Sequence, residues 1–171
     1  EGHVESTIRK ETDLHPIDIH LTRMMAKISF KYVTAEAAKS LIVTRVIINN
    51  MPLAMRMEET PKEENYPAGN DFETRSVTLD NNFSSGKVYT FYMPANRRGS
   101  SSNTDPKLKN NGAPDKALYV QLFVSSKSNG SNFLYTIYLG ENDTNDYNVR
   151  RNHNYNITLN LKSEIRDDRV L

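Results

Sequence analysis

The chain has 171 residues, of which 22 are lysine or arginine and 21 are aspartate or glutamate, and it contains no cysteine. A chain of this length is typical of one domain with a single hydrophobic core, and the missing cysteines exclude disulfide bonds, thiolate metal sites and cysteine nucleophiles. The net charge of +1 gives no sequence-wide field that would attract nucleic acid or an acidic membrane, so no nucleic-acid partner is predicted.

The first strand is predicted shortly after residue 24. Residues 1–20 carry many charges and Pro16 without an apolar period, which indicates an N-terminal arm. Apolar residues then alternate with polar ones from Ala26 to Tyr32, as in a half-buried strand. We therefore predict an arm at residues 1–20, a single domain at residues 21–163 and a short charged tail at residues 164–171.

The middle of the chain predicts further strands separated by polar loops. Residues 41–48 are apolar on both faces and rich in β-branched side chains, as in a central strand covered on two sides. Residues 60–71 predict a loop, and residues 76–79 and 87–93 predict two strands with a turn between them. The polar segment 94–116 is long for a loop inside a compact domain, and such loops are usually functional or disordered.

Alternating strands continue to the end of the domain. Residues 117–125 and 133–140 predict a hairpin. Residues 135–140 and 154–161, connected through the turn at residues 141–148, predict antiparallel strands with one buried face. Seven or eight strands without a long helix indicate a sandwich or a barrel, and we predict an all-β fold, an antiparallel β-sandwich of about seven or eight strands.

No catalytic residue, cofactor or metal site is predicted. The acidic turn at residues 141–146 lacks the glycine and the distal glutamate of an EF-hand loop, so it is interpreted as a solvated turn. The four histidines lack the grouping that a zinc site needs. Neither Ser100 nor Ser131 lies in a G-x-S-x-G frame. Nothing in the pattern favours a pair of carboxylates for glycoside hydrolysis.

Two groups of side chains are candidate contacts for a ligand or partner. The pairs Arg97–Arg98 and Arg150–Arg151 either form a basic patch for phosphate or an acidic glycan, or are solvated charges in a loop and at a strand end. Several tyrosines either stack on sugar rings from the surface or complete the core and its rim. These tyrosines are Tyr66, Tyr119, Tyr138 and Tyr147.

Three stretches carry a family resemblance. The C-terminal one reads YTIYLGEN at 135–142, NDYNV at 145–149 and RRNHNYNITL at 150–159. An opening strand, LTRMMAKI, lies at 21–28, and an element YMPANRRG lies at 92–99, with Ala95 where an acid is common. In this order they resemble the fimbrillin-type proteins, which are surface adhesins and pilus subunits of Bacteroides-like anaerobes.

The resemblance implies a sandwich with transthyretin-like or Greek-key connections and a non-enzymatic function at the cell surface. The expected role is a fimbrial anchor, tip or accessory subunit that associates by β-strand addition. Expected partners are other fimbrial subunits or host surface proteins and glycans. Stalk subunits of the family are cut by an arginine-specific protease, so Arg9 and Arg23 are candidate processing sites. The tail at 163–171 is short and charged, a poor donor strand, which favours an anchor, tip or accessory subunit over a stalk subunit.

The resemblance also implies an exported protein in a fimbrium at the outer membrane, with a lipid-carrying cysteine upstream of Glu1. No membrane-spanning segment is predicted, because the longest apolar-rich run, residues 117–124, is far shorter than the roughly 20 residues that a membrane helix requires. The alternative function is a carbohydrate-binding β-sandwich module of a surface polysaccharide-uptake system. That alternative would be favoured if Tyr66, Tyr119 or Tyr147 lined an exposed concave face.

Overall fold

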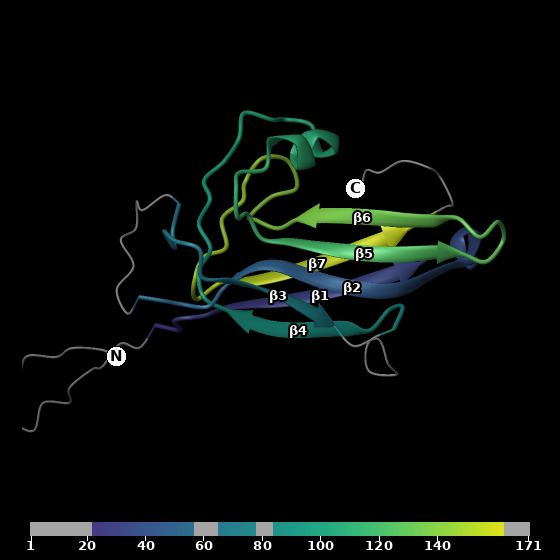
Figure 1. Cartoon of the computed structure of the whole chain (residues 1–171), viewed down its shortest axis with the longest axis horizontal. Helices are drawn as coiled ribbons and strands as arrows, with labels where there is room; N and C mark the ends of the chain where they lie inside the picture. Colours follow the sequence, from purple (N-terminus) through teal and green to yellow (C-terminus); the bar gives the residue numbers. More distant parts are fainter. Residues whose placement is uncertain (1–21, 57–64, 78–83, 163–171) are drawn as a thin grey trace, which may run out of the picture.

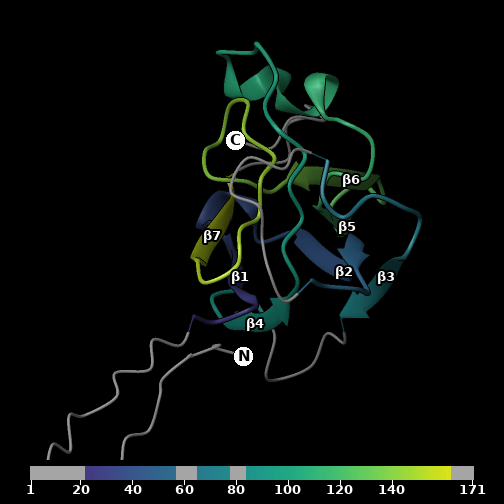
Figure 2. The ribbon, with the colours of Figure 1, turned by 90° about the vertical axis from the view of Figure 1, so that its left-hand side faces the viewer.

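Two β-sheets stacked face to face make up the body of the protein (Figures 1 and 2). The computed structural model describes residues 22–56, 65–77 and 84–162, so Arg9, the whole of the predicted arm and the predicted tail lie outside the described residues. The strands are β1 (Ala26–Thr34), β2 (Leu41–Pro52), β3 (Phe72–Val77), β4 (Val88–Met93), β5 (Tyr119–Ser126), β6 (Asn132–Tyr138) and β7 (Asn154–Leu161). Two short 3-10 helices accompany them, η1 (Glu36–Ala38) and η2 (Pro106–Gly112). The predicted all-β sandwich is confirmed.

The strand order is β4-β1-β7 in one sheet and β3-β2-β5-β6 in the other. Neither sheet by itself has the 4-1-2-3 order of a Greek key, and the choice between transthyretin-like and Greek-key connections stays a prediction. The predicted β5–β6 hairpin is confirmed. The predicted antiparallel pairing of the last two strands is wrong, because β6 pairs with β5 whereas β7 runs parallel to β1 in the other sheet. A two-residue period predicts which face of a strand is buried, but it does not predict which other strand pairs with it.

Strands β3 and β4 also belong to different sheets, although the sequence predicted them as neighbours joined by a turn. The predicted central position of β2 is correct, because it lies between β3 and β5. The prediction that β2 is buried on both faces is correct for only part of the strand. Leu41 and Val43 are buried with Ile42 exposed between them, whereas all residues from Val46 to Asn49 are buried.

The core lies between the sheets and is filled by every second residue of the strands, as alternation predicts. Along β1, Ala26, Ile28, Phe30 and Tyr32 are buried and the residues between them are not. The buried cluster draws on all seven strands and includes Ile48, Phe91, Leu122, Tyr135 and Leu159. None of the helices among the described residues has the length and apolar character needed to cross a membrane.

The long polar segment at 94–116 is ordered rather than a free loop. Residues 94–98 continue from β4 and are buried, and the chain then forms η2 before it returns to β5. The N-terminus of η2 is capped by Asp105, whose carboxylate accepts a hydrogen bond from the backbone N–H of Lys107 at 2.9 Å, and Pro106 follows the cap. Helix η2 therefore lies fixed beside the end of β6, where it borders the site described next (Figure 1).

Candidate functional site

A groove runs between β6 and β7, the edge strands of the two sheets on the same side of the sandwich (Figure 2). Among the described residues, β6 pairs only with β5 and β7 pairs only with β1. The groove has a volume of about 380 Å³. Its apolar lining consists of Ile137, Leu139, Ile157 and Leu159. An unpaired strand edge beside apolar side chains is the arrangement that accepts an added strand.

The open edge of β7 presents defined backbone groups to the groove. The carbonyl of His153 accepts from the N–H of Lys27 at 2.9 Å, and the carbonyl of Leu161 accepts from the N–H of Ala35 at 2.9 Å. Because backbone groups of a strand alternate sides with a period of two, the odd positions of β7 face β1 and the even positions face outward. Asn156 and Thr158 therefore offer their N–H and C=O groups to a strand that lies in the groove.

Lys109 of η2 lines the groove and is almost completely buried. Its ammonium group donates a hydrogen bond to the backbone carbonyl of Asn142 and lies 5.4 Å from the centre of the Tyr147 ring. The Tyr147 hydroxyl in turn donates to the carbonyl of Lys109 at 2.7 Å. Burial lowers the pKa of Lys109 to about 8, against the opposing influence of Asp146 and Asp143. No sequence pattern indicates this lysine, because its burial depends on the way η2 folds back onto the sandwich.

This lysine is expected to make the folded protein more stable as the pH rises from about 8 to about 10.5. In that window the unfolded chain keeps the proton on Lys109, because its ordinary pKa is 10.5, while the folded chain, with a pKa of about 8, loses it. The state that binds more protons is disfavoured as pH rises, so the free energy of unfolding increases.

Urea unfolding near pH 7.5 and near pH 9.5 tests this expectation, with the Lys109→Met variant as the control that lacks the rise. The measurement stays below pH 10 because burial raises the pKa of Tyr155 to about 12, which lowers stability in more alkaline solution. An equal pH response in the two proteins would show that Lys109 is not the group responsible.

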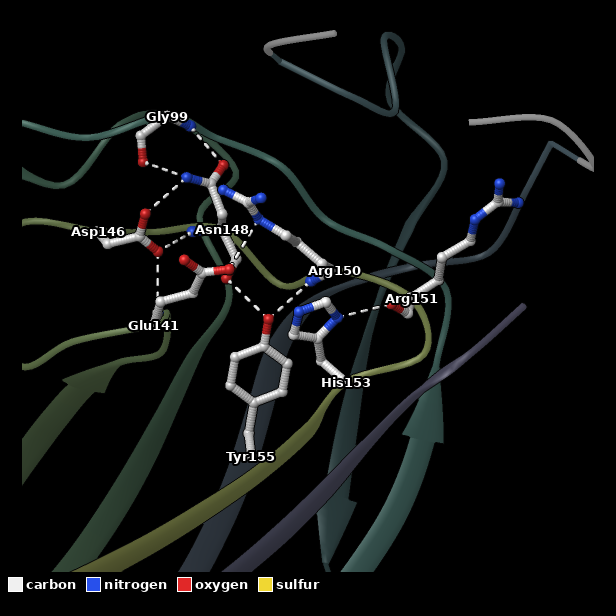
Figure 3. Close-up of polar contacts among 8 residues, drawn as sticks. All are labelled: Gly99, Glu141, Asp146, Asn148, Arg150, Arg151, His153 and Tyr155. Atoms are coloured by element: carbon white, nitrogen blue, oxygen red, sulfur yellow. Dashed lines mark hydrogen bonds and ion pairs between the residues drawn. The ribbon is translucent and has the colours of Figure 1, made fainter. Parts of the chain in front are cut away.

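The turn at residues 141–146 contributes residues 141–143 to one end of the groove. Hydrogen bonds within the turn hold its shape, and Figure 3 shows the one between Asp146 and Glu141. The Asn142 side-chain oxygen accepts from the N–H groups of Thr144, Asn145 and Asp146 at 2.9 to 3.1 Å. The Asp146 carboxylate accepts from the N–H of Glu141 at 2.8 Å. The side-chain oxygens of Asn142 and Asp146 therefore accept hydrogen bonds from backbone N–H groups within the turn, as expected for a turn built from Asn and Asp.

Gly140 is required at the start of this turn. A Cβ atom at Gly140 would lie 1.9 Å from the backbone carbonyl oxygen of Asp146, which is too close for any side chain. The glycine in the YxIYLG motif therefore allows the chain leaving β6 to fold back on itself, and this sets the end of the groove.

The two predicted arginine pairs lie on neighbouring segments of the chain. Asn96 and Val149 exchange two backbone hydrogen bonds at 2.7 and 2.8 Å, and Ser100 forms a bridge with Asp146. Segments 96–100 and 146–149 therefore run side by side. The side chains of the two pairs nevertheless have different environments, and they do not form the predicted basic patch.

Arg97 and Arg98 are each only 7% exposed, so both expectations for them, a ligand-binding patch and a solvated loop charge, are wrong. The Nε of Arg98 donates to the side-chain oxygen of Asn96 at 2.7 Å, its terminal nitrogen donates to the carbonyl of Pro67 at 2.9 Å, and its guanidinium lies 5.0 Å from the centre of the Phe72 ring. Burial lowers the pKa of Arg98 below its usual value, partly offset by Asp115. These contacts hold the segment after β4 against Pro67 and Phe72.

Asn96 is a structural residue that the sequence reasoning missed. It is fully buried, and its amide donates to the carbonyls of Asn50 at 3.2 Å and Lys116 at 3.0 Å. Asn50 has a φ angle of 61° and lies where the pairing register of β2 with β3 shifts. Lys116 has a φ angle of 59° and lies shortly before β5. The asparagine of the YMPANRRG element therefore connects the end of β4 to the opposite sheet.

Arg150, Glu141 and Tyr155 form a polar cluster at the start of β7 (Figure 3). Arg150 pairs with Glu141 through Nε and Oε1 at 2.7 Å, and its backbone N–H donates to the Tyr155 hydroxyl at 2.8 Å. Burial is the main cause that raises the pKa of Tyr155. The Arg151 side chain points away from this cluster in Figure 3, and its carbonyl lies 2.8 Å from Nδ1 of His153. Arg150 therefore has a structural role, because it connects Glu141 to Tyr155 of β7. Arg151 is half-buried beside it.

The tyrosines do not form the predicted sugar-stacking face. Tyr66 and Tyr147 are buried, which agrees with the interpretation that they complete the core and its rim and contradicts their exposure at the surface. Tyr119 and Tyr138 are half-buried and contact each other, with 5.0 Å between ring centres. Arg23 is exposed in the segment just before β1, consistent with access by a protease.

Comparison with known proteins gives one family match. Residues 91–159 match a domain of unknown function, DUF4906. The match covers under half of the chain, from the end of β4 to most of β7, and it includes Asn96, Lys109 and all residues that line the groove. No curated protein matches the chain.

Proposed function

We propose that this protein is a non-enzymatic structural or adhesive subunit of a fimbrillin-like surface fibre, and that a partner strand enters the groove between β6 and β7. The single observation that carries the proposal is the groove itself: two sheet edges that lack a further strand among the described residues, with an apolar lining between them. The resemblance of the three sequence motifs to fimbrillin-type proteins supports the same function.

The occupant is an extended segment of another subunit with apolar residues at every second position. Its backbone would bond to the outward-facing groups of Asn156 and Thr158, and its apolar side chains would contact Ile137, Leu139 and Ile157. Backbone pairing supplies affinity, and the spacing of the apolar contacts supplies register.

The proposal places the protein in a fimbrium at the cell surface, held to the outer membrane by a lipid attached upstream of Glu1. Within the fibre the proposed position is that of an anchor, tip or accessory subunit. Processing at Arg9 or Arg23 is part of this proposal, and the exposure of Arg23 supports it.

A mixing experiment tests the proposal. The protein is incubated with fimbrial subunits, with and without prior cleavage by a trypsin-like protease, and the size of the complexes is followed by light scattering. Assembly after cleavage would indicate strand exchange, and assembly without cleavage would indicate an anchor or cap. A protein that stays monomeric with every subunit would contradict the proposal.

The alternative function is a carbohydrate-binding module of a polysaccharide-uptake system, and the tyrosines predicted to bind sugar do not form a site for it. Its tyrosines are buried or half-buried rather than gathered on an exposed concave face. The structural and adhesive function is therefore the one that the groove favours.

A further inference from the structure

A second hollow, of about 620 Å³, lies at the end of the three-stranded sheet where β1 and β7 begin and β4 ends, at the left of Figure 1. This volume is in the range of small-molecule sites. Its lining shares no residue with the groove between β6 and β7. The residues that line it are Arg23, Met24, Met25, Lys27, Tyr92, Asn152, His153 and Asn154.

Backbone hydrogen bonds hold two walls of this hollow together. The N–H of Asn152 donates to the carbonyl of Met25 at 3.1 Å, and the N–H of Lys27 donates to the carbonyl of His153 at 2.9 Å. Asn152 has a φ angle of 59°, the left-handed conformation that asparagine tolerates better than most residues. The turn before β7 is thereby fixed against the segment before β1.

The His153 ring is held in a defined orientation. Its Nδ1 lies 2.8 Å from the carbonyl oxygen of Arg151, and its ring stacks at 6.2 Å between ring centres on that of the buried Tyr155. Since a carbonyl can only accept, Nδ1 carries a proton. Nε2 is therefore the ring nitrogen left for a ligand.

The hollow has a positive and partly aromatic lining. Arg23 and Lys27 both contribute to it, neither forms an ion pair with an acid among the described residues, and no described lining residue is acidic. Tyr92 is 58% exposed and lies directly opposite Lys27 in the pairing of β1 with β4. Asn154 lies opposite Lys27 on the other side, in β7, and it too is exposed.

We propose that this hollow binds an acidic saccharide. The carboxylate or sulfate of the sugar would bind between Arg23 and Lys27, and a sugar ring would stack on the exposed ring of Tyr92. The amides of Asn152 and Asn154 each offer donors and an acceptor, which suit sugar hydroxyl groups. The carboxylates of an acidic peptide would bind Arg23 and Lys27. Such a peptide would lack the hydroxyl groups and the ring that suit the asparagine amides and Tyr92. The proposal does not depend on strand addition, because the two sites share no residue.

Isothermal titration of the full chain tests the proposal with four probes. Trigalacturonate offers carboxylates, a carrageenan tetrasaccharide offers sulfates, methyl-esterified trigalacturonate is the uncharged match of the first, and hexaglutamate represents an acidic peptide. We expect at least one acidic saccharide to bind, and whichever binds more tightly identifies the preferred anion. The uncharged ester should bind about tenfold more weakly than trigalacturonate if the carboxylate is the anion recognised.

Matched variants locate the binding. Lys27→Gln should weaken binding of the acidic saccharide about tenfold. Lys31→Gln, four positions further along the same strand and outside the hollow, should leave it unchanged. Tyr92→Thr should weaken binding while preserving the strand, because threonine is also a good strand former.

Three results would overturn the proposal. They are equal losses in Lys27→Gln and Lys31→Gln, hexaglutamate binding as tightly as the best saccharide, and no heat of binding from either acidic saccharide at millimolar concentration. Urea unfolding of each variant separates a loss of binding from a loss of folding.

Discussion

Replacing Asn96 by alanine is expected to lower the free energy of unfolding by about 3 to 5 kcal/mol. The asparagine side chain is fully buried and makes three hydrogen bonds, as donor to the carbonyls of Asn50 and Lys116 and as acceptor from Nε of Arg98. Alanine removes all three and leaves a buried guanidinium without one of its acceptors. Urea unfolding followed by circular dichroism measures the loss.

Asn160→Ala is the matched control, because Asn160 is exposed on β7 and its replacement should change stability by less than about 0.5 kcal/mol. Asn96→Asp should also be strongly destabilising although it keeps the acceptor for Arg98, because a carboxylate oxygen would face the carbonyl oxygens of Asn50 and Lys116. A loss below about 1 kcal/mol in Asn96→Ala would contradict the role assigned to this residue, because it would mean that other groups satisfy the same partners.

Replacing Thr158 by proline is expected to weaken binding of a partner strand by roughly 10- to 100-fold, if the partner enters the groove as proposed. Proline removes the outward-facing N–H of position 158, and its ring occupies the space beside the open edge. Because that N–H points away from β1, the pairing of β1 with β7 should survive. Light scattering of mixtures with fimbrial subunits measures the association.

Thr158→Val provides the control, because valine keeps the backbone N–H and the branched side chain. Urea unfolding of both variants confirms that each is folded before association is compared. Undiminished assembly of a folded Thr158→Pro variant would rule out pairing along β7 and would direct attention to β6, β3 and β4, the other edge strands.

The sequence predicted the strands well because each has a two-residue period that is independent of its neighbours. Ala26 to Tyr32 alternate in burial as expected, and so do the apolar positions of β5 and β7. The partners of the strands were harder to predict, since the chain crosses from one sheet to the other after β1, β3, β4 and β6. A turn signal such as the one at residues 141–148 looks the same whether it closes a hairpin or leads to the other sheet.

The candidate site residues were predicted less well, because their burial depends on segments far away in the chain. Arg98 looks like a surface charge until Phe72 and Pro67 are placed against it. Tyr147 looks like an exposed turn residue until η2 covers it and Lys109 lies over its ring. The groove itself has no sequence signature, since it forms only when the edges of two separate sheets come to lie on one side of the sandwich.

The parallel pairing of β1 with β7 has a mechanical consequence. Lys27 to Thr34 pair in continuous register with Asn154 to Leu161, so β1 begins at one end of the sandwich and β7 finishes at the other. Tension applied to the chain before β1 and after β7 therefore pulls the two strands past each other. The backbone hydrogen bonds between them bear this load together, whereas a hairpin pulled at its two ends opens one bond at a time. In the surface fibre proposed above, the joint between β1 and β7 would resist shear as a unit.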